Sequence, residues 1–316
     1  MFTFAVKRLL WAIPTLLGVT VATFLMIHLI PGNVVQVMLG TSSALSPRQM
    51  AELSALYGLD RPLWTQYLTW LSALLRGDLG FSLRSGVPAG QLISQAFAIT
   101  MELTVIAMLL SLLLALTTGI VAAVRRGGWL DLGARAVAII GLSIPHFWLG
   151  TMLILGASLY MPSLSTFSFV PFTKAPLENL RAMILPAFAL GLSLTAIVMR
   201  QTRAAMLEVL AQPYIQTARS KGLHERAVIF RHALRNALIP IVTIVGLQFG
   251  YLLGGAVVIE NVFALPGVGR VVVNAINQRD YPLVQGSVFL IASLFVVINL
   301  LVDIAYGLIN PRVRYQ

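Results

Sequence analysis

Apolar residues form six long runs along this chain, separated by polar and charged segments. A helix that crosses a bilayer core about 30 Å thick needs about 20 apolar residues, and each run approaches this length. The pattern therefore predicts six membrane-spanning helices in an all-α, polytopic membrane protein. The predicted spans cover residues 9–30, 103–124, 136–160, 182–199, 237–259 and 284–308.

The long segment between the first two spans, residues 31–98, carries helical signals of its own. Ser46–Gln49 forms a capping box, which predicts a short helix ending at Gly58. A second helix is predicted over residues 62–76. It is too short to span a membrane, so it either packs against the bundle or offers a docking surface to an outer partner. Its aromatic residues, which suit a membrane interface, are Trp64, Tyr67 and Trp70.

The composition agrees with a membrane protein. Of the 316 residues, 58% are hydrophobic and only 10% are charged, and the mean hydropathy is +0.87. A soluble domain of this length needs more charge to cover its surface. The absence of cysteine excludes disulfides and thiolate metal sites. The net charge of +11 would also fit nucleic-acid binding, so the distribution of the charges has to decide.

The basic residues gather on one side of the predicted bundle. With six spans both termini lie on the same side, which holds 14 Lys and Arg residues and three acidic residues. The opposite side holds eight basic and six acidic residues. This positive-inside bias predicts cytoplasmic termini. It leaves membrane lipid, and not nucleic acid, as the partner of the basic side.

The polar segment between the fourth and fifth spans has the order of a helix-turn-helix. Pro213 suits the first turn of a helix, and a short helix from Tyr214 to Lys221 is expected to end at Gly222, where positive φ costs nothing. A second helix then leads into the fifth span. The segment is either an ordinary basic loop touching anionic lipid or a docking element, and its helical order favours docking. The basic residues around the turn are Arg219, Lys221, Arg226, Arg231 and Arg235.

This segment resembles the EAA loop of ABC importer permeases, in the version typical of the dipeptide, oligopeptide and nickel branch. Gln216-Thr217-Ala218 occupies the E-A-A positions, and Gly222 falls at the required spacing. Arg235 stands where the general pattern has proline, and Pro240 comes five residues later. The stretches T-A-R-x-K-G and H-A-L-R-N-A-L-x-P are usual in this branch. Pro213 departs from the acidic residue that often precedes the tyrosine.

The resemblance covers nearly the whole chain. Outside the loop it rests on short motifs that are weak singly but specific in this order and spacing. They are Gly58–Pro62, Arg76–Gly80, Ser143–Pro145, Gly254-Gly255, Pro266–Arg270, Arg279–Pro282 and Asn310–Arg312.

The resemblance implies the type I ABC importer transmembrane fold in a bacterial inner membrane. It implies half of a translocation pathway, a second related permease, two cytoplasmic ATPase subunits and an extracytoplasmic substrate-binding protein. The implied substrate is a di- or oligopeptide, and nickel, glutathione and oligosaccharide are alternatives within the same branch. The residues implied to couple to the ATPase are Gln216, Thr217, Ala218, Arg219, Lys221, Gly222 and Leu223.

Three regions of the chain are expected from this resemblance. Residues 1–95 would hold the first span and the outer segment. Residues 96–307 would form the ABC transmembrane type-1 domain, with the coupling loop at about 200–240, and residues 308–316 would form a cytoplasmic tail.

The remaining functional alternatives are a secondary transporter and an intramembrane enzyme, which would both need reactive or ionisable residues in this chain. No G-x-x-x-x-G-K-[ST] motif occurs, so ATP is expected on partner subunits, with no cofactor, metal or catalytic residue here. A secondary transporter would need several buried ionisable residues. An intramembrane enzyme would need an acid pair, a nucleophile with its base, or a metal set, and none is visible. The few ionisable candidates inside the spans are His28, Glu102, His146 and Asp303; for His146 and Asp303, pairing within the bundle and a part in the path stay open.

Overall fold

The computed structural model describes residues 2–28, 48, 52, 54–55, 58–82, 84–161 and 169–309, with only the backbone at 2–9, 27 and 303–309. Contacts divide the chain into two compact units. Unit 1 comprises residues 100–265 and 298–316, and unit 2 comprises residues 2–99 and 266–297. Apart from Arg48, the predicted capping box lies outside the described residues, as does the motif at residues 310–312.

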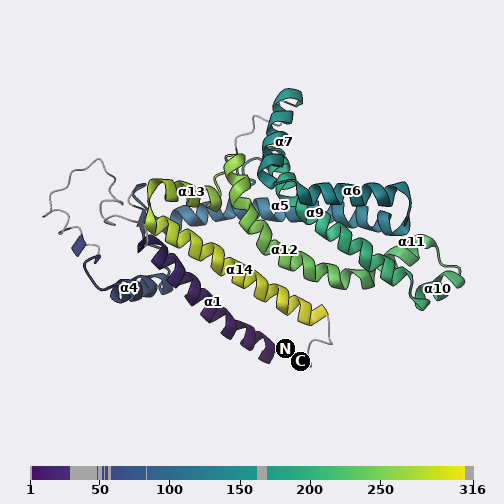
Figure 1. Cartoon of the computed structure of the whole chain (residues 1–316), viewed down its shortest axis with the longest axis horizontal. Helices are drawn as coiled ribbons and strands as arrows, with labels where there is room; N and C mark the ends of the chain where they lie inside the picture. The colour runs from purple at the N-terminus through teal and green to yellow at the C-terminus, as the bar shows by residue number, and fades with distance from the viewer. Residues whose placement is uncertain are drawn as a thin grey trace. The chain divides into compact units, whose positions relative to one another are not determined.

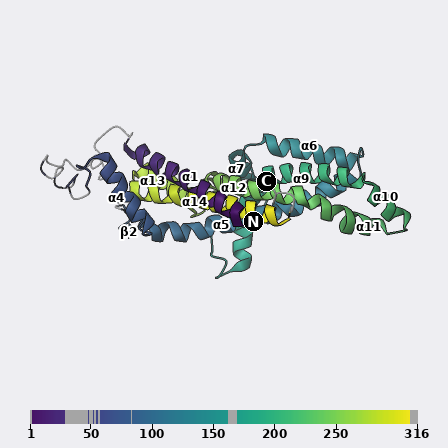
Figure 2. The ribbon, with the colours of Figure 1, turned by 90° about the horizontal axis from the view of Figure 1, so that it is seen from below.

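The regular elements in the described part of unit 1 are all helices (Figures 1 and 2). Its short elements α10 and α11 lie together at one end, away from α7. Two long helices, α5 (Ala89–Val124) and α14 (Tyr281–Ile309), run through both units. The other elements are α6 Trp129–Ser143, α7 His146–Tyr160, α9 Pro176–Leu210, α10 Pro213–Ser220, α11 Glu225–Ala227, the π-helix η1 Val228–Ala233 and α12 Leu234–Val262.

Among its described elements, unit 2 has two helices from the start of the chain and one from near its end. These are α1 Phe2–His28, α4 Leu63–Leu75 and α13 Val268–Gln278. Between α4 and α5, a small hairpin pairs β1 (Phe81–Ser82) antiparallel with β2 (Val87–Pro88). Phe81 lies opposite Pro88 in this register.

Helix α4 packs on α1 through its aromatic side chains. The Tyr67 hydroxyl is hydrogen-bonded to the Thr20 hydroxyl at 2.9 Å. The ring of Phe24 lies 5.4 Å from the ring of Tyr67 and 6.1 Å from that of Trp70. Trp64, on the same helix, is exposed. Packing, the first of the two alternatives for this helix, is therefore what its described contacts support.

Four described helices are long and apolar enough to cross a membrane. They are α5, α9, α14 and the continuous helix of α11, η1 and α12. The pair α6 and α7 gives a fifth if it is one span, and α1 has a shorter apolar stretch, Leu10–Met26. The all-α, multi-span fold is thus confirmed, whereas six spans and cytoplasmic termini stay predictions.

The third predicted span, residues 136–160, is not one straight helix. Helix α6 ends at Ser143, α7 begins at His146, and the two are bent by 105°. Pro145 explains the break, because it has no N–H to donate and disfavours helical backbone at the preceding residue. That residue, Ile144, is extended, with ψ of 124°. Residues 136–160 can still form one span, broken at Pro145, so this predicted span stays a prediction.

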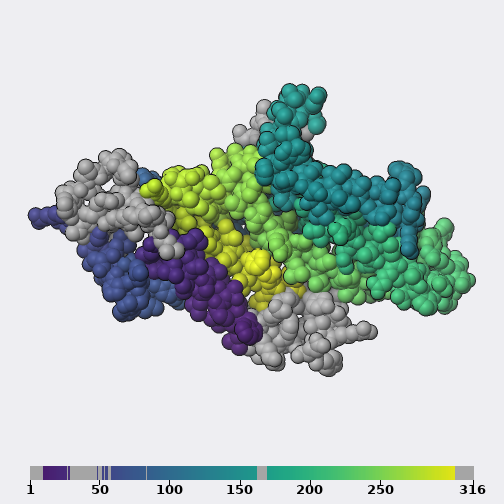
Figure 3. Space-filling view, in the orientation of Figure 1, coloured from purple at the N-terminus to yellow at the C-terminus, as the bar shows by residue number. Residues whose placement is uncertain are grey.

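Helix α9 forms the centre of unit 1. Within its apolar window 56% of the residues are buried, against 28% for α5. Helices α6, α7 and α12 all pack on it, and Figure 3 shows α6 along one flank. Helix α5 approaches at Gly191, whose carbonyl accepts a 2.8 Å hydrogen bond from the Ser111 hydroxyl. A β-carbon at Gly191 would clash with that hydroxyl, so this close contact requires glycine.

Candidate functional site

The candidate site is the turn between α9 and α12, where the predicted short helix forms as α10. Pro213 occupies its first turn, where a backbone N–H is not needed. At the other end the Gly222 N–H donates to the Arg219 carbonyl at 2.9 Å, and Gly222 has φ of +75°. The predicted helix and its glycine stop are therefore confirmed. A residue with a β-carbon would be strained at this turn.

Helix α10 is held on the bundle by one apolar face. Ile215 is fully buried and Ala218 is 7% exposed, and they lie three residues apart, on the same side of the helix. Both belong to a core cluster with residues of α9, η1 and α12, including Met206, Val228 and Ala233. The short helix is thus fixed to α9, η1 and α12 of unit 1.

The opposite face of α10 and the turn after it are open to solvent. Six of the seven residues implied by the resemblance are exposed, and Ala218 alone is buried. Leu223, which follows the turn, is 41% exposed and presents an apolar side chain on an otherwise polar surface. The exposed six are Gln216, Thr217, Arg219, Lys221, Gly222 and Leu223.

An ion pair crosses the glycine turn and links the helices on either side. The Arg219 guanidinium donates two hydrogen bonds to the Glu225 carboxylate, at 2.7 and 3.2 Å. The hydrogen bonds to this carboxylate raise the pKa of Arg219, which stays positively charged. Both side chains are about half exposed, so the pair contributes little stability. Its two-pronged geometry joins the residue before the turn to the residue after it in one defined orientation.

A second polar contact ties the start of α10 to α12. The Asn236 side-chain amide donates to the Tyr214 hydroxyl at 2.7 Å. Between the turn and α12 the chain forms the π-helix η1, in which the Leu234 N–H donates to the Ile229 carbonyl five residues earlier. Such π-segments often occur at functional sites. The sequence predicted a plain second helix here, because hydrophobic periodicity does not distinguish a π-turn from an α-turn.

A buried ion pair, which no sequence motif predicted, joins α6 to α9. Asp131, in the first turn of α6, is 1% exposed and accepts hydrogen bonds from Arg203 of α9 at 2.6 and 2.8 Å. The Gly127 N–H donates to the same carboxylate at 2.9 Å, and Arg135 lies 3.4 Å away. In the sequence, Asp131 and Arg203 stand out only as two of the charges on the predicted inner side. Only the packing of two distant helices brings them together.

Two further carboxylates, expected on the outer side, are buried. In unit 1 Glu260 is fully buried and accepts a 2.6 Å hydrogen bond from the Thr100 hydroxyl. In unit 2 Asp280, 4% exposed, accepts a hydrogen bond from Ser82. Asp280 lies within the motif Arg279–Pro282 and Ser82 follows the motif Arg76–Gly80 by two residues, so position in a motif was the available signal for that pair. Glu260 lies outside the motifs.

The open question of His146 is partly answered. Its Nδ1 lies 3.1 Å from the Ala189 carbonyl of α9, so the ring is paired within the bundle. In unit 2, His28 contacts the Phe24 carbonyl at 2.9 Å. The side chain of Asp303 lies outside the described residues.

Comparison with known proteins gives consistent matches. The family described as "binding-protein-dependent transport system inner membrane component" matches residues 115–315, and its N-terminal companion matches residues 1–112. The dipeptide transport system permease protein DppB of Escherichia coli (strain K12) is 41% identical over 339 residues, with 100% of each chain covered. The di/tripeptide permease protein DppB of Pseudomonas aeruginosa (strain UCBPP-PA14) is 42% identical over 336 residues, again over 100% of both chains. The dipeptide permease protein DppB of Alkalihalophilus pseudofirmus is 41% identical over 338 residues, with the same full coverage.

Proposed function

Because the chain belongs to the family of binding-protein-dependent transport system inner membrane components, we propose that it is a permease subunit of an ABC importer for di- or oligopeptides. It is a multi-pass protein of the bacterial inner membrane. The observation that carries the proposal is identity of 41–42% along the full length of permeases named for dipeptide and di/tripeptide transport. Matches confined to one segment would support a shared fold but not a shared substrate class.

The chain is proposed to work without chemistry of its own. A second, related permease would complete the pathway, two ATPase subunits would use ATP on the cytoplasmic side, and an extracytoplasmic binding protein would deliver the peptide. The family description, which names a binding protein and a membrane component, supports this division of labour. Six spans, cytoplasmic termini and a transmembrane domain over residues 96–307 belong to the same proposal.

The coupling contact is proposed at the exposed face of α10 and the turn that follows. ATP binding can bias two arrangements of a membrane bundle only through a contact that differs between them. Gln216, Thr217, Arg219, Lys221, Gly222 and Leu223 would form that surface. Ala218 would act from beneath, because its burial fixes the helix to the core cluster.

Uptake by the reconstituted complex tests the proposal. The chain would be coexpressed with the permease, ATPases and binding protein encoded beside it, and inserted into vesicles. We expect ATP-dependent uptake of labelled dipeptide, and no ATP hydrolysis by this chain purified alone. Uptake of nickel, glutathione or an oligosaccharide in place of peptide would correct the substrate, and transport driven by an ion gradient without ATPases would overturn the proposal.

A further inference from the structure

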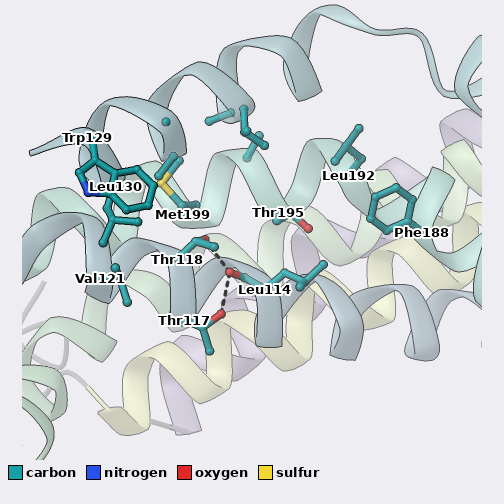
Figure 4. Close-up of a pocket in the computed structure, with 15 residues that line it drawn as sticks. Leu114, Thr117, Thr118, Val121, Trp129, Leu130, Phe188, Leu192, Thr195 and Met199 are labelled. Carbon is teal, nitrogen blue, oxygen red and sulfur yellow. Dashed lines mark hydrogen bonds between the residues drawn. The ribbon is translucent and has the colours of Figure 1, made fainter. Parts of the chain in front are cut away.

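A groove of about 530 Å³ runs between α5, α6 and α9 within unit 1 (Figure 4). Trp129, Leu130 and Met199 lie at one end of it, and Phe188 and Leu192 lie toward the other. Its walls are almost entirely aliphatic and aromatic. The groove is therefore elongated along the helices, as a single hydrocarbon chain would require.

The hydroxyl groups in the groove are already hydrogen-bonded to backbone. Thr117 and Thr118 both donate to the Leu114 carbonyl, at 3.0 and 2.5 Å, as the dashed lines in Figure 4 show. Thr195 donates to the Gly191 carbonyl at 3.0 Å. The hydroxyl protons of these three threonines are thus already engaged by backbone carbonyls. A peptide or sugar would leave its own polar groups unpaired here, at a high cost in free energy.

One end of the groove carries positive charge and an aromatic residue. Val121 of α5 and Trp129 of α6 both line it, and the loop between them holds Arg125 and Arg126. Both arginines are exposed, and Trp129 is 80% exposed. Tryptophan and arginine are the residues that contact lipid headgroups at a membrane interface.

We propose that this groove binds an anionic phospholipid, with one acyl chain along α5, α6 and α9 and the phosphate at Arg125 and Arg126. Bulk lipid is as apolar as the groove, so burial alone would not favour one lipid over another. A preference for one lipid over another arises from close packing of its acyl chain in the groove and from attraction between its phosphate and the basic end. The inference rests on the membrane location of the chain and not on its substrate.

Gly133 offers a way to fill the groove without disturbing the bundle. It lines the groove, and a β-carbon added there meets no atom within 4 Å. Gly133→Leu therefore places a side chain in the space of the proposed acyl chain. Gly156→Leu, on α7 and outside the groove, is the matched control because its β-carbon position is equally open. The double variant Arg125→Gln/Arg126→Gln removes the charges alone.

Native mass spectrometry of the detergent-purified chain, with the subunits that copurify, measures binding of added phosphatidylglycerol and phosphatidylcholine. We expect wild type and Gly156→Leu to retain phosphatidylglycerol more tightly. Gly133→Leu should weaken retention of both lipids, and the arginine variant should lower affinity for phosphatidylglycerol alone, about fivefold for each arginine. Unchanged retention in Gly133→Leu, or equal retention of both lipids by wild type, would overturn the proposal. So would loss of a copurifying subunit from Gly133→Leu with lipid retained, because a protein would then occupy the groove.

Discussion

The backbone conformation of Gly222, a residue of the sequence motif, determines how the chain turns after α10 at the candidate coupling site. Its φ of +75° lies in the left-handed region, and a β-carbon there would meet no neighbouring atom, so only backbone strain opposes substitution. Replacement tests the geometry of the turn without confounding steric clashes.

We expect Gly222→Val to reduce peptide uptake and the stimulation of ATP hydrolysis by loaded binding protein. Strain of about 1–3 kcal/mol would be relieved by resetting the turn, which moves the exposed face of α10. Gly222→Asn, which tolerates positive φ, should stay near wild type. The control is Gly86→Val, at a turn of unit 2 with φ of +67° and equally open space. Normal uptake and stimulation in Gly222→Val would show that this turn does not couple the subunits.

Arg219 has two possible roles, which charge reversal separates. If it serves mainly to hold the turn through Glu225, then Arg219→Glu and Glu225→Arg should each impair coupling, and the double variant should restore it. The energy at stake in an exposed pair is about 0.2–1 kcal/mol, so folding should be unaffected in all three. If Arg219 contacts the ATPase, the double variant should stay impaired. ATPase stimulation in vesicles is the measurement.

At the scale of the element, α10 depends on the face that it buries. Ile215→Ala removes a fully buried side chain, and such changes cost about 2–5 kcal/mol. We expect faster hydrogen exchange at the amides of α10, together with weaker coupling. Gln216→Ala, at the neighbouring exposed position, should leave exchange unchanged. Equal exchange in both variants would mean that α10 is not held by its core cluster.

The pairing of α6 with α9 rests on a buried charge. Asp131→Asn leaves Arg203, whose side chain is only 21% exposed, without its counter-ion, and removing one partner of such a pair is destabilising. We expect a clear fall in the thermal unfolding temperature of the detergent-solubilised protein. Arg135→Gln should cost less than about 1 kcal/mol, because that partner is 47% exposed. A similar fall in both variants would show that the ion pair between Asp131 and Arg203 is not what stabilises the contact between α6 and α9.

At the scale of the whole molecule, the charge asymmetry predicts which segments face each side of the membrane. The chain has no cysteine, so single introduced cysteines report cleanly on access. Ser85→Cys, exposed in the hairpin of the outer segment, should react with an impermeant thiol reagent in intact cells. Ser220→Cys, equally exposed at the end of α10, should react only after the membrane is opened. Labelling of Ser220→Cys in intact cells would reverse the orientation.

The sequence by itself determined the features that depend on neighbouring residues. The apolar runs predicted a helical protein with several spans, because the length of a hydrophobic run is a local property of the sequence. Gly222 predicted the end of α10, because glycine adopts positive φ without strain. The motifs around that turn pointed to the family before any contact was known. The 105° bend between α6 and α7 was predicted only in part: the sequence shows a proline at Pro145 but does not determine the angle between the two helices.

Only the tertiary structure decided which distant residues meet. Asp131 pairs with Arg203, 72 positions later, and Ile215 and Ala218 are buried because residues of α5, α9, η1 and α12 gather around them. This packing turned Ala218, one of the seven motif residues, inward and left the other six exposed. The groove is formed separately, by the packing of α5, α6 and α9. Such contacts depend on how helices pack, and helix packing is set by the shapes of whole surfaces, which no local pattern of residues encodes.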